Sequence, residues 1–200
     1  MDDTETGQAE SDDRPPSSRA SGSGTPDSSP IRSLEVQDPE RRLDATRRAW
    51  LQSHGLAAME HLGAEGEVAV RVMGDDAMAQ AHERFIGFPD PTDVLTFDYR
   101  QERGSETGPA PSADEPLETD ILVCLDVAER EANEHGHDAM RELLLYIVHG
   151  LLHCMGHDDT DDERAAAMHA KEDEVLRAIG VGAVYAPVAD QTQRHGGDAS

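Results

Sequence analysis

The spacing of apolar residues along the chain predicts helices that alternate with strands. Short stretches in which apolar residues alternate with others, or follow one another without a break, predict three strands: Glu67–Val72, Val94–Tyr99 and Thr119–Leu125. Apolar residues at helical spacing predict helices over residues 38–62, 76–86, 126–134 and 141–155. Residues 87–91 and 101–117 contain the breakers proline and glycine, and we interpret them as a turn and a surface loop.

The helix predicted over residues 141–155 is apolar on most sides, so we expect it to be central, and Gly156 ends it. A last helix begins with a capping box, in which Thr160 is followed three residues later by Glu163, and ends before Gly180. Helices interleaved with strands indicate an α/β protein with a small mixed sheet.

Composition separates one domain from two tails. The first 30 residues hold 17 Ser, Thr, Gly or Pro and only three apolar residues, so they cannot bury a core. We therefore expect a disordered acidic tail over 1–36, a single domain over 38–182 and a flexible tail over 183–200. The two cysteines exclude a disulfide scaffold and favour a reduced, cytoplasmic location. The acidic N-terminus is not typical of a signal peptide, and no apolar run approaches the roughly 20 residues of a membrane span.

The net charge is −25, and Lys171 is the only lysine. Such a charge argues against binding of nucleic acid, DNA included, through a basic surface. The same surface resembles that of proteins from salt-accumulating halophiles, where the Debye length is about 3 Å at 1 M salt and the acidic field hardly reaches a substrate. Under that second interpretation the charge no longer excludes RNA.

The most specific chemical pattern lies at the end of the central helix. His149 and His153 are four residues apart and share one helix face, where two imidazoles can hold a divalent ion such as zinc at about 2.0–2.1 Å. Gly156 permits the chain to reverse and return Asp159 as a third ligand. His157 is a rival third ligand, provided that the helix continues past Gly156.

Neighbouring residues have simpler interpretations. A bare pair of histidines four apart often arises by chance, and only the added glycine and aspartate favour a metal. We expect Cys154 to fill the core and His135 and His137 to be exposed.

Zinc peptidases carry H-E-x-x-H, in which the glutamate is the general base. That position is Gly150, so peptide hydrolysis is disfavoured and phosphodiester cleavage aided by a Lewis acid is favoured.

At this point the sequence resembles the YbeY family of bacterial metal-dependent endoribonucleases. The family signature H-G-x-L-H-L-x-G-Y-D-H is similar to HGLLHCMGHDD at 149–159, and P-T-D-V-L-S-F is similar to PTDVLTF at 91–97. The block G-D-I corresponds to TDI at 119–121, and Met168, Glu172 and Leu176 also match. The resemblance covers about residues 65–180.

The resemblance implies a four-stranded, mostly parallel sheet and a zinc ion held by three motif histidines. It also implies cleavage of single-stranded RNA, in maturation of the small-subunit (16S) rRNA 3′ end and in ribosome quality control. Here Asp159 replaces the third histidine, His157 the signature tyrosine, and Ile86 an arginine thought to face the phosphate. Aspartate is a competent zinc ligand.

Three hypotheses follow. The first is a zinc endoribonuclease that binds rRNA and the ribosome, with His149, His153 and Asp159 as ligands and no catalytic residue predicted beyond the metal centre. The second is a non-catalytic ribosome-assembly factor that keeps a structural zinc. The third is a metzincin-like metallopeptidase.

Overall fold

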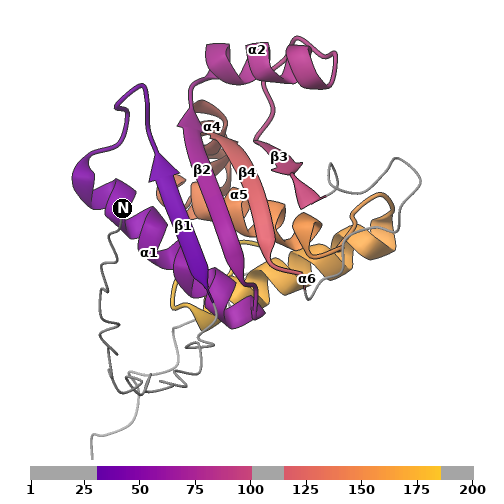
Figure 1. Ribbon diagram of the computed structural model, residues 1–200. Coiled ribbons are helices and arrows are strands. Elements are labelled where there is room, and N and C mark those ends of the chain that lie inside the picture. Colours follow the sequence, from indigo (N-terminus) through magenta and orange to yellow (C-terminus); the bar gives the residue numbers. More distant parts are fainter. Residues whose placement is uncertain (1–30, 101–114, 186–200) are drawn as a thin grey trace, which may run out of the picture.

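The computed structural model describes residues 31–100 and 115–185, which form a four-stranded sheet with helices on both faces (Figure 1). The strands are β1 (Arg32–Gln37), β2 (Gly66–Met73), β3 (Val94–Asp98) and β4 (Leu117–Cys124). The helices are α1 (Ala45–Leu62), α2 (Asp75–Phe85), α4 (Leu125–His135), α5 (Ala139–Cys154) and α6 (Asp162–Ala178). None of these helices is long and apolar enough to cross a membrane.

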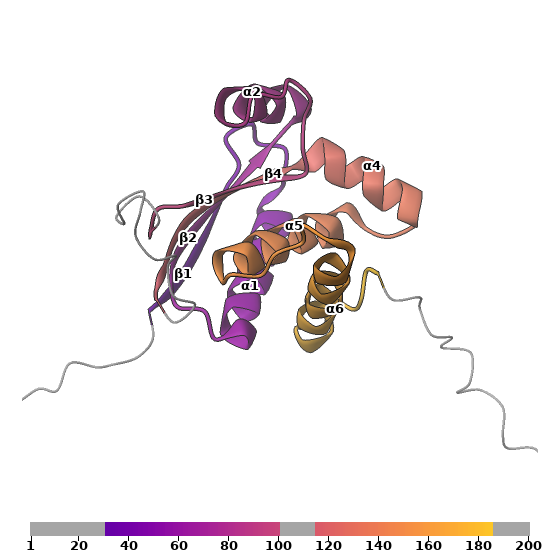
Figure 2. The same ribbon diagram turned by 90° about the vertical axis from the view of Figure 1, so that its right-hand side faces the viewer.

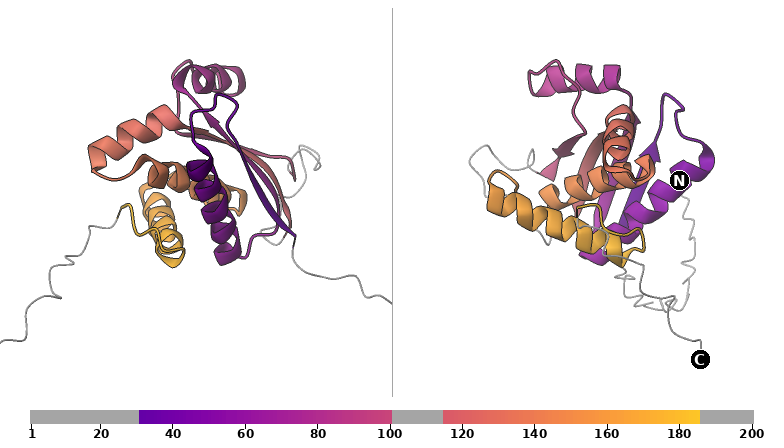
Figure 3. Two further views of the ribbon diagram at one scale, coloured as in Figure 1. Left: turned by 90° about the vertical axis from the view of Figure 1, so that its left-hand side faces the viewer. Right: turned by 180° about the vertical axis from the view of Figure 1, so that it is seen from behind.

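The strand order is β1-β2-β4-β3, with β1, β2 and β4 parallel and β3 antiparallel at one edge. This arrangement confirms the predicted α/β fold with a small, mostly parallel mixed sheet. Helices α1 and α5 cover one face of the sheet, and α6 packs outside α5 (Figures 2 and 3). Helix α2 lies on the opposite face, over a smaller apolar cluster formed by Met78, Ala81, Leu95, Leu122 and Cys124.

The prediction of a central helix is confirmed, because α5 is buried on almost every side within the main core. Gly150 of α5 lies directly against the sheet. A Cβ atom there would lie 2.9 Å from Thr96 Oγ1 and 3.2 Å from Ile121 Cδ1, both closer than is comfortable for a side chain. Glycine therefore lets α5 approach the edge strand β3, and it sets the histidines of α5 beside that strand.

Most boundaries lie within two residues of the predictions, and the following differences are the informative ones. Strand β1 includes residues 32–36, which were expected in the tail, because Leu34 and Val36 are buried against the core. The first helix begins at Ala45, after its N-cap Asp44, and β4 begins at Leu117, inside the predicted loop. Val184, assigned to the C-terminal tail, donates its backbone N–H to Asp173 Oδ1 of α6 at 2.6 Å. The expected disorder of residues 1–30 and 186–200, and most of the predicted loop, lie outside the described residues.

The predicted capping box is wrong. The N-cap of α6 is Asp161, whose Oδ1 accepts a hydrogen bond from Arg164 N at 2.8 Å. Thr160 Oγ1 instead donates to Asp158 Oδ2 at 2.9 Å. Aspartate and threonine are both good N-caps, and the turn that precedes the helix decides which of them is used.

Candidate metal centre

Two histidines from α5 and one aspartate from the following loop converge at the C-terminal end of the central helix. His149 Nε2 and His153 Nε2 lie 2.9 Å apart, and Asp159 Oδ2 lies 3.7 Å from His149 Nε2. Asp159 Oδ1 lies 3.8 Å from His153 Nε2, and within the described residues this is the one group of three ligand atoms found close enough together for a metal ion. The structure thus brings together the three residues predicted from the sequence as ligands.

A chain reversal carries Asp159 to the histidines. Gly156 has φ +90°, a conformation that side chains other than glycine rarely adopt. The N–H of His157 then donates to Leu152 O at 3.0 Å, which closes the end of α5. The ring of His157 is exposed and is not part of the group, so the structure does not support it as the rival third ligand.

Each histidine is oriented by a contact of its Nδ1 atom, the ring nitrogen that does not face the candidate metal position. His149 Nδ1 lies 2.7 Å from Glu172 Oε1, a fully buried carboxylate of α6. His153 Nδ1 lies 3.1 Å from the backbone carbonyl of His157. Both oxygens act as acceptors, so Nδ1 carries the proton in each neutral ring, and the two Nε2 lone pairs face each other. Two lone pairs at 2.9 Å repel unless a cation or a proton lies between them.

The arrangement therefore fits a divalent ion. Two neutral imidazole nitrogens and one carboxylate oxygen are a common zinc ligand set, with a fourth position open. Ligands of a tetrahedral zinc ion lie about 3.3 Å from one another, and the three distances here fall on either side of that value. Burial disfavours the charged His149 ring, but the hydrogen bond and the charge of Glu172 outweigh it, so the pKa of His149 is raised. A bound ion competes with this proton.

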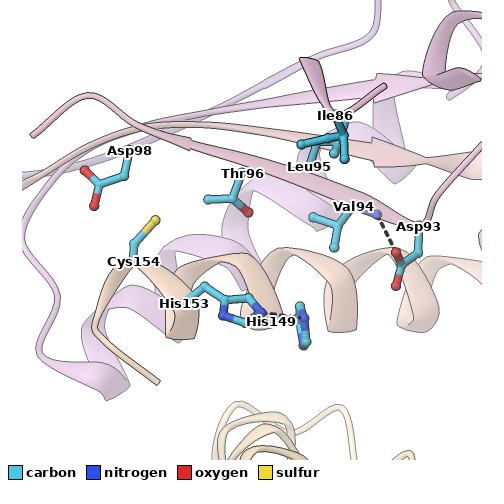
Figure 4. A pocket seen from close by; sticks show the side chains of 9 residues that line it. All are labelled: Ile86, Asp93, Val94, Leu95, Thr96, Asp98, His149, His153 and Cys154. Carbon is cyan, nitrogen blue, oxygen red and sulfur yellow. Dashed lines mark hydrogen bonds between the residues drawn. The ribbon is translucent and has the colours of Figure 1, made fainter. Parts of the chain in front are cut away.

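A cavity of about 450 Å³ lies between the end of α5 and strand β3 (Figure 4). Both histidines line it, and the opposite wall is formed by Ile86, Asp93, Val94, Leu95, Thr96 and Asp98. No lysine or arginine is among these lining residues. Phosphate groups that enter the cavity would therefore meet few cationic side chains.

Arg100 was not predicted, but it fixes one end of the cavity. The side chain is almost fully buried, and its Nη2 donates to Asp98 Oδ2 at 2.7 Å and also to the carbonyl of Cys154. It thus joins the end of β3 to the last turn of α5, where a cation is also favoured by the helix dipole. No sequence pattern connects residues 100 and 154, so this contact could not be found from the sequence.

Of the remaining predictions for residues near the site, those for Cys154 and His135 are confirmed and the one for His137 is wrong. Cys154 is buried as expected, and burial raises the pKa of its thiol. His135 is exposed, but His137 is not: its side chain is 10% exposed, and its Nε2 lies 3.1 Å from Glu142 Oε2. The prediction for His137 is wrong because the turn before α5 folds this ring against the first turn of that helix.

Fold and site together define a small α/β protein with a candidate metal centre at the end of its central helix. Residues 33–180 match the family model described as Endoribonuclease YbeY. A relative named Endoribonuclease YbeY from Methylibium petroleiphilum is 34% identical over 145 residues, which cover 72% of this chain and 89% of that protein. Another, from Bacillus licheniformis, is 29% identical over 150 residues, 74% of this chain and 95% of that protein.

The solution structure of TM1509 from Thermotoga maritima has the same fold, with a TM-score of 0.51 and 24% identity over 74% of this chain and 88% of the other. The chain belongs to the YbeY endoribonuclease family, whose members are named as nucleases. This confirms the resemblance stated from the motifs and the enzyme class that it implied, a hydrolase of phosphodiester bonds.

Proposed function

We propose that the protein is a zinc-dependent endoribonuclease that cleaves single-stranded rRNA, in maturation of the 16S rRNA 3′ end and in ribosome quality control. His149, His153 and Asp159 hold one zinc ion in this proposal. The observation that carries it is the convergence of three ligand atoms, two of them imidazole Nε2 atoms that lie 2.9 Å apart. Family membership supports RNA, and by extension the small ribosomal subunit, as the partner.

The chain's own residues prepare the site for this chemistry. Glu172 and the carbonyl of His157 hold the Nδ1 protons, so the Nε2 atoms of both histidines stay available as ligands. Arg100 neutralises Asp98, which removes one negative charge from the path of an anionic substrate. A zinc ion, when bound, supplies Lewis acidity toward a phosphoryl oxygen.

The peptidase alternative receives no support from the geometry. In zinc peptidases the residue after the first histidine is a glutamate that acts as general base. The corresponding Gly150 faces Thr96 and Ile121 of the sheet, where even a Cβ atom is crowded. A glutamate at this position would have to displace one of these two side chains.

A cleavage assay tests the proposal. The zinc-loaded protein, the His153→Ala variant and a chelated sample are incubated at high salt with a single-stranded RNA and with casein. We expect the RNA to be cut only by the zinc-loaded protein, and casein by none of the samples. Equal cleavage by His153→Ala, or no cleavage of any RNA, would contradict the proposal. Failure to cut RNA together with unfolding on chelation would favour the assembly factor with a structural zinc.

A further inference from the structure

An exposed apolar surface adjoins the candidate metal centre. It consists of Phe85, Ile86 and Phe88, which we call the aromatic patch, and their exposed fractions are 53%, 55% and 61%. These residues end α2 and begin the loop that leads to β3 (Figure 1). Burial of a phenylalanine is favourable by about 1.5–3 kcal/mol, so three large apolar side chains left in water at one place indicate a binding surface.

The aromatic patch is continuous with the cavity. Ile86 lines the cavity, and in Figure 4 it lies beside Leu95, across from His149 and His153. A chain that passes over the patch is therefore led toward the candidate metal centre. This continuity makes the substrate of that centre the simplest occupant of the patch.

Each aromatic ring of the patch lies against a neighbouring ring. Phe85 packs edge-on against Phe97, with ring centroids 4.8 Å apart and an interplanar angle of 67°. The ring of Phe88 lies 5.8 Å from that of His82, whose Nδ1 is 2.7 Å from the carbonyl oxygen of Asp90. A preorganised ring loses little entropy when a partner stacks on it.

Charge distinguishes between the ways in which RNA could be held here. The cavity lining holds no lysine or arginine, and the net charge of the chain is −25. Among the described residues, the cation found over a ring of the patch is Arg84, whose guanidinium carbon lies 5.3 Å from the centroid of the Phe85 ring. Contacts to phosphate, which dominate most nucleic-acid binding, are therefore sparse, whereas base faces can stack on aromatic rings without any charge.

We infer that the aromatic patch is a stacking platform for unpaired bases, on which Phe88 holds single-stranded RNA at the mouth of the metal cavity. This inference rests on the proposed function and names residues that select its substrate. A duplex keeps its base faces stacked on one another, so it cannot use the platform. Ile86, which stands where the family resemblance expects a phosphate-facing arginine, is the member of the patch that lines the cavity.

Stopped-flow fluorescence tests the inference with zinc-loaded protein and a single-stranded RNA of about ten nucleotides that carries 2-aminopurine. Binding is recorded within the first second, and cleavage is followed separately on the same samples. We expect Phe88→Ala to weaken binding about tenfold and to abolish the stacking-dependent change in fluorescence. Phe88→Trp restores both, whereas Phe88→Leu, which is apolar but cannot stack, does not. Ile31→Ala, which removes a side chain that is 71% exposed, is the matched control and leaves binding unchanged.

Salt provides a second readout. Binding through phosphates weakens steeply as the salt concentration rises. RNA that is held by stacking is instead repelled by the negative charge of this protein, and salt screens that repulsion. We expect affinity to stay constant or to rise between about 0.1 and 1 M salt. Wild-type affinity in Phe88→Ala would overturn the inference and favour an apolar protein partner for the patch. Full rescue by leucine would overturn it as well, because RNA would then be held by apolar contact without stacking.

The two proposals can fail separately. Phe88-dependent binding without cleavage by the wild type would remove the nuclease function and keep the platform. Cleavage and binding that do not depend on Phe88 would remove the platform and keep the nuclease function.

Discussion

Replacement of Glu172 by glutamine tests whether the buried carboxylate behind His149 strengthens the binding of a metal ion at the candidate site. Glu172 accepts a hydrogen bond from His149 Nδ1 at 2.7 Å, and its side chain is fully buried. Glutamine keeps the shape and a carbonyl acceptor but removes the charge. A hydrogen bond to a charged group contributes about 1.5–3 kcal/mol and a neutral one about 0.5–1.5 kcal/mol. The difference, about 1–1.5 kcal/mol, corresponds to a roughly tenfold loss of zinc affinity.

The assay is a titration of zinc into the protein in competition with a chromophoric chelator at pH 7. Glu174→Gln is the matched control, because it removes the same charge from α6 at a site that is 54% exposed and bonded to Lys171. We expect the control to bind zinc like the wild type. Both variants should keep the fold, since loss of a buried charge offsets the weaker hydrogen bond. Unchanged affinity in a folded Glu172→Gln protein would refute the argument that this carboxylate orients His149.

Three further predictions concern packing, pH and salt. Gly150→Ala should lower the unfolding free energy by about 1–3 kcal/mol, because the new Cβ would meet Thr96 Oγ1 at 2.9 Å. Thermal melting of the double variant should show partial rescue, since Thr96→Ala removes that oxygen. If the effects of the two substitutions on stability simply added, the clash would be contradicted. The hydrogen bond from Arg42 lowers the pKa of Asp126 from 3.8 to about 2, so its ionised form stabilises the fold above about pH 4. Asp126→Asn should cost about 2 kcal/mol in urea unfolding at pH 7, and the cost should shrink as pH falls from about 4 toward 2; a cost independent of pH would exclude the ion pair as its source. Finally, the net charge of −25 should make the melting temperature rise with salt up to molar concentrations, and a temperature unchanged by salt would contradict the halophilic interpretation.

Differences between predicted and observed elements follow the range of the interactions that decide them. Period and spacing are local, and they correctly indicated the strand around Val70, the central α5 and the helical face shared by His149 and His153. Strand β1 was missed because six residues beside a long polar stretch carry little pattern, and its burial depends on pairing with β2. The N-cap of α6 was misplaced by one residue because both candidates can cap a helix.

The residues that support the candidate site from distant parts of the chain could not be predicted from local sequence patterns either. Glu172 was noted from the family resemblance, but its contact with His149 spans 23 residues and two helices. Its signal in the sequence was an acidic residue at an apolar position of α6, between Met168 and Leu176. The contact of Arg100 with Cys154 spans 54 residues and has no sequence signal.

By itself the sequence determined the α/β class, the family and the three candidate ligands, because helical spacing and a glycine reversal act over a few residues. Tertiary structure alone decided how these ligands are held and what surrounds them. The packing of α6 on α5 supplies the carboxylate behind His149, and the antiparallel edge strand supplies the far wall of the cavity. The tertiary structure also leaves the aromatic patch exposed beside that wall, because the way in which α2 and β3 meet decides which side chains remain in contact with water.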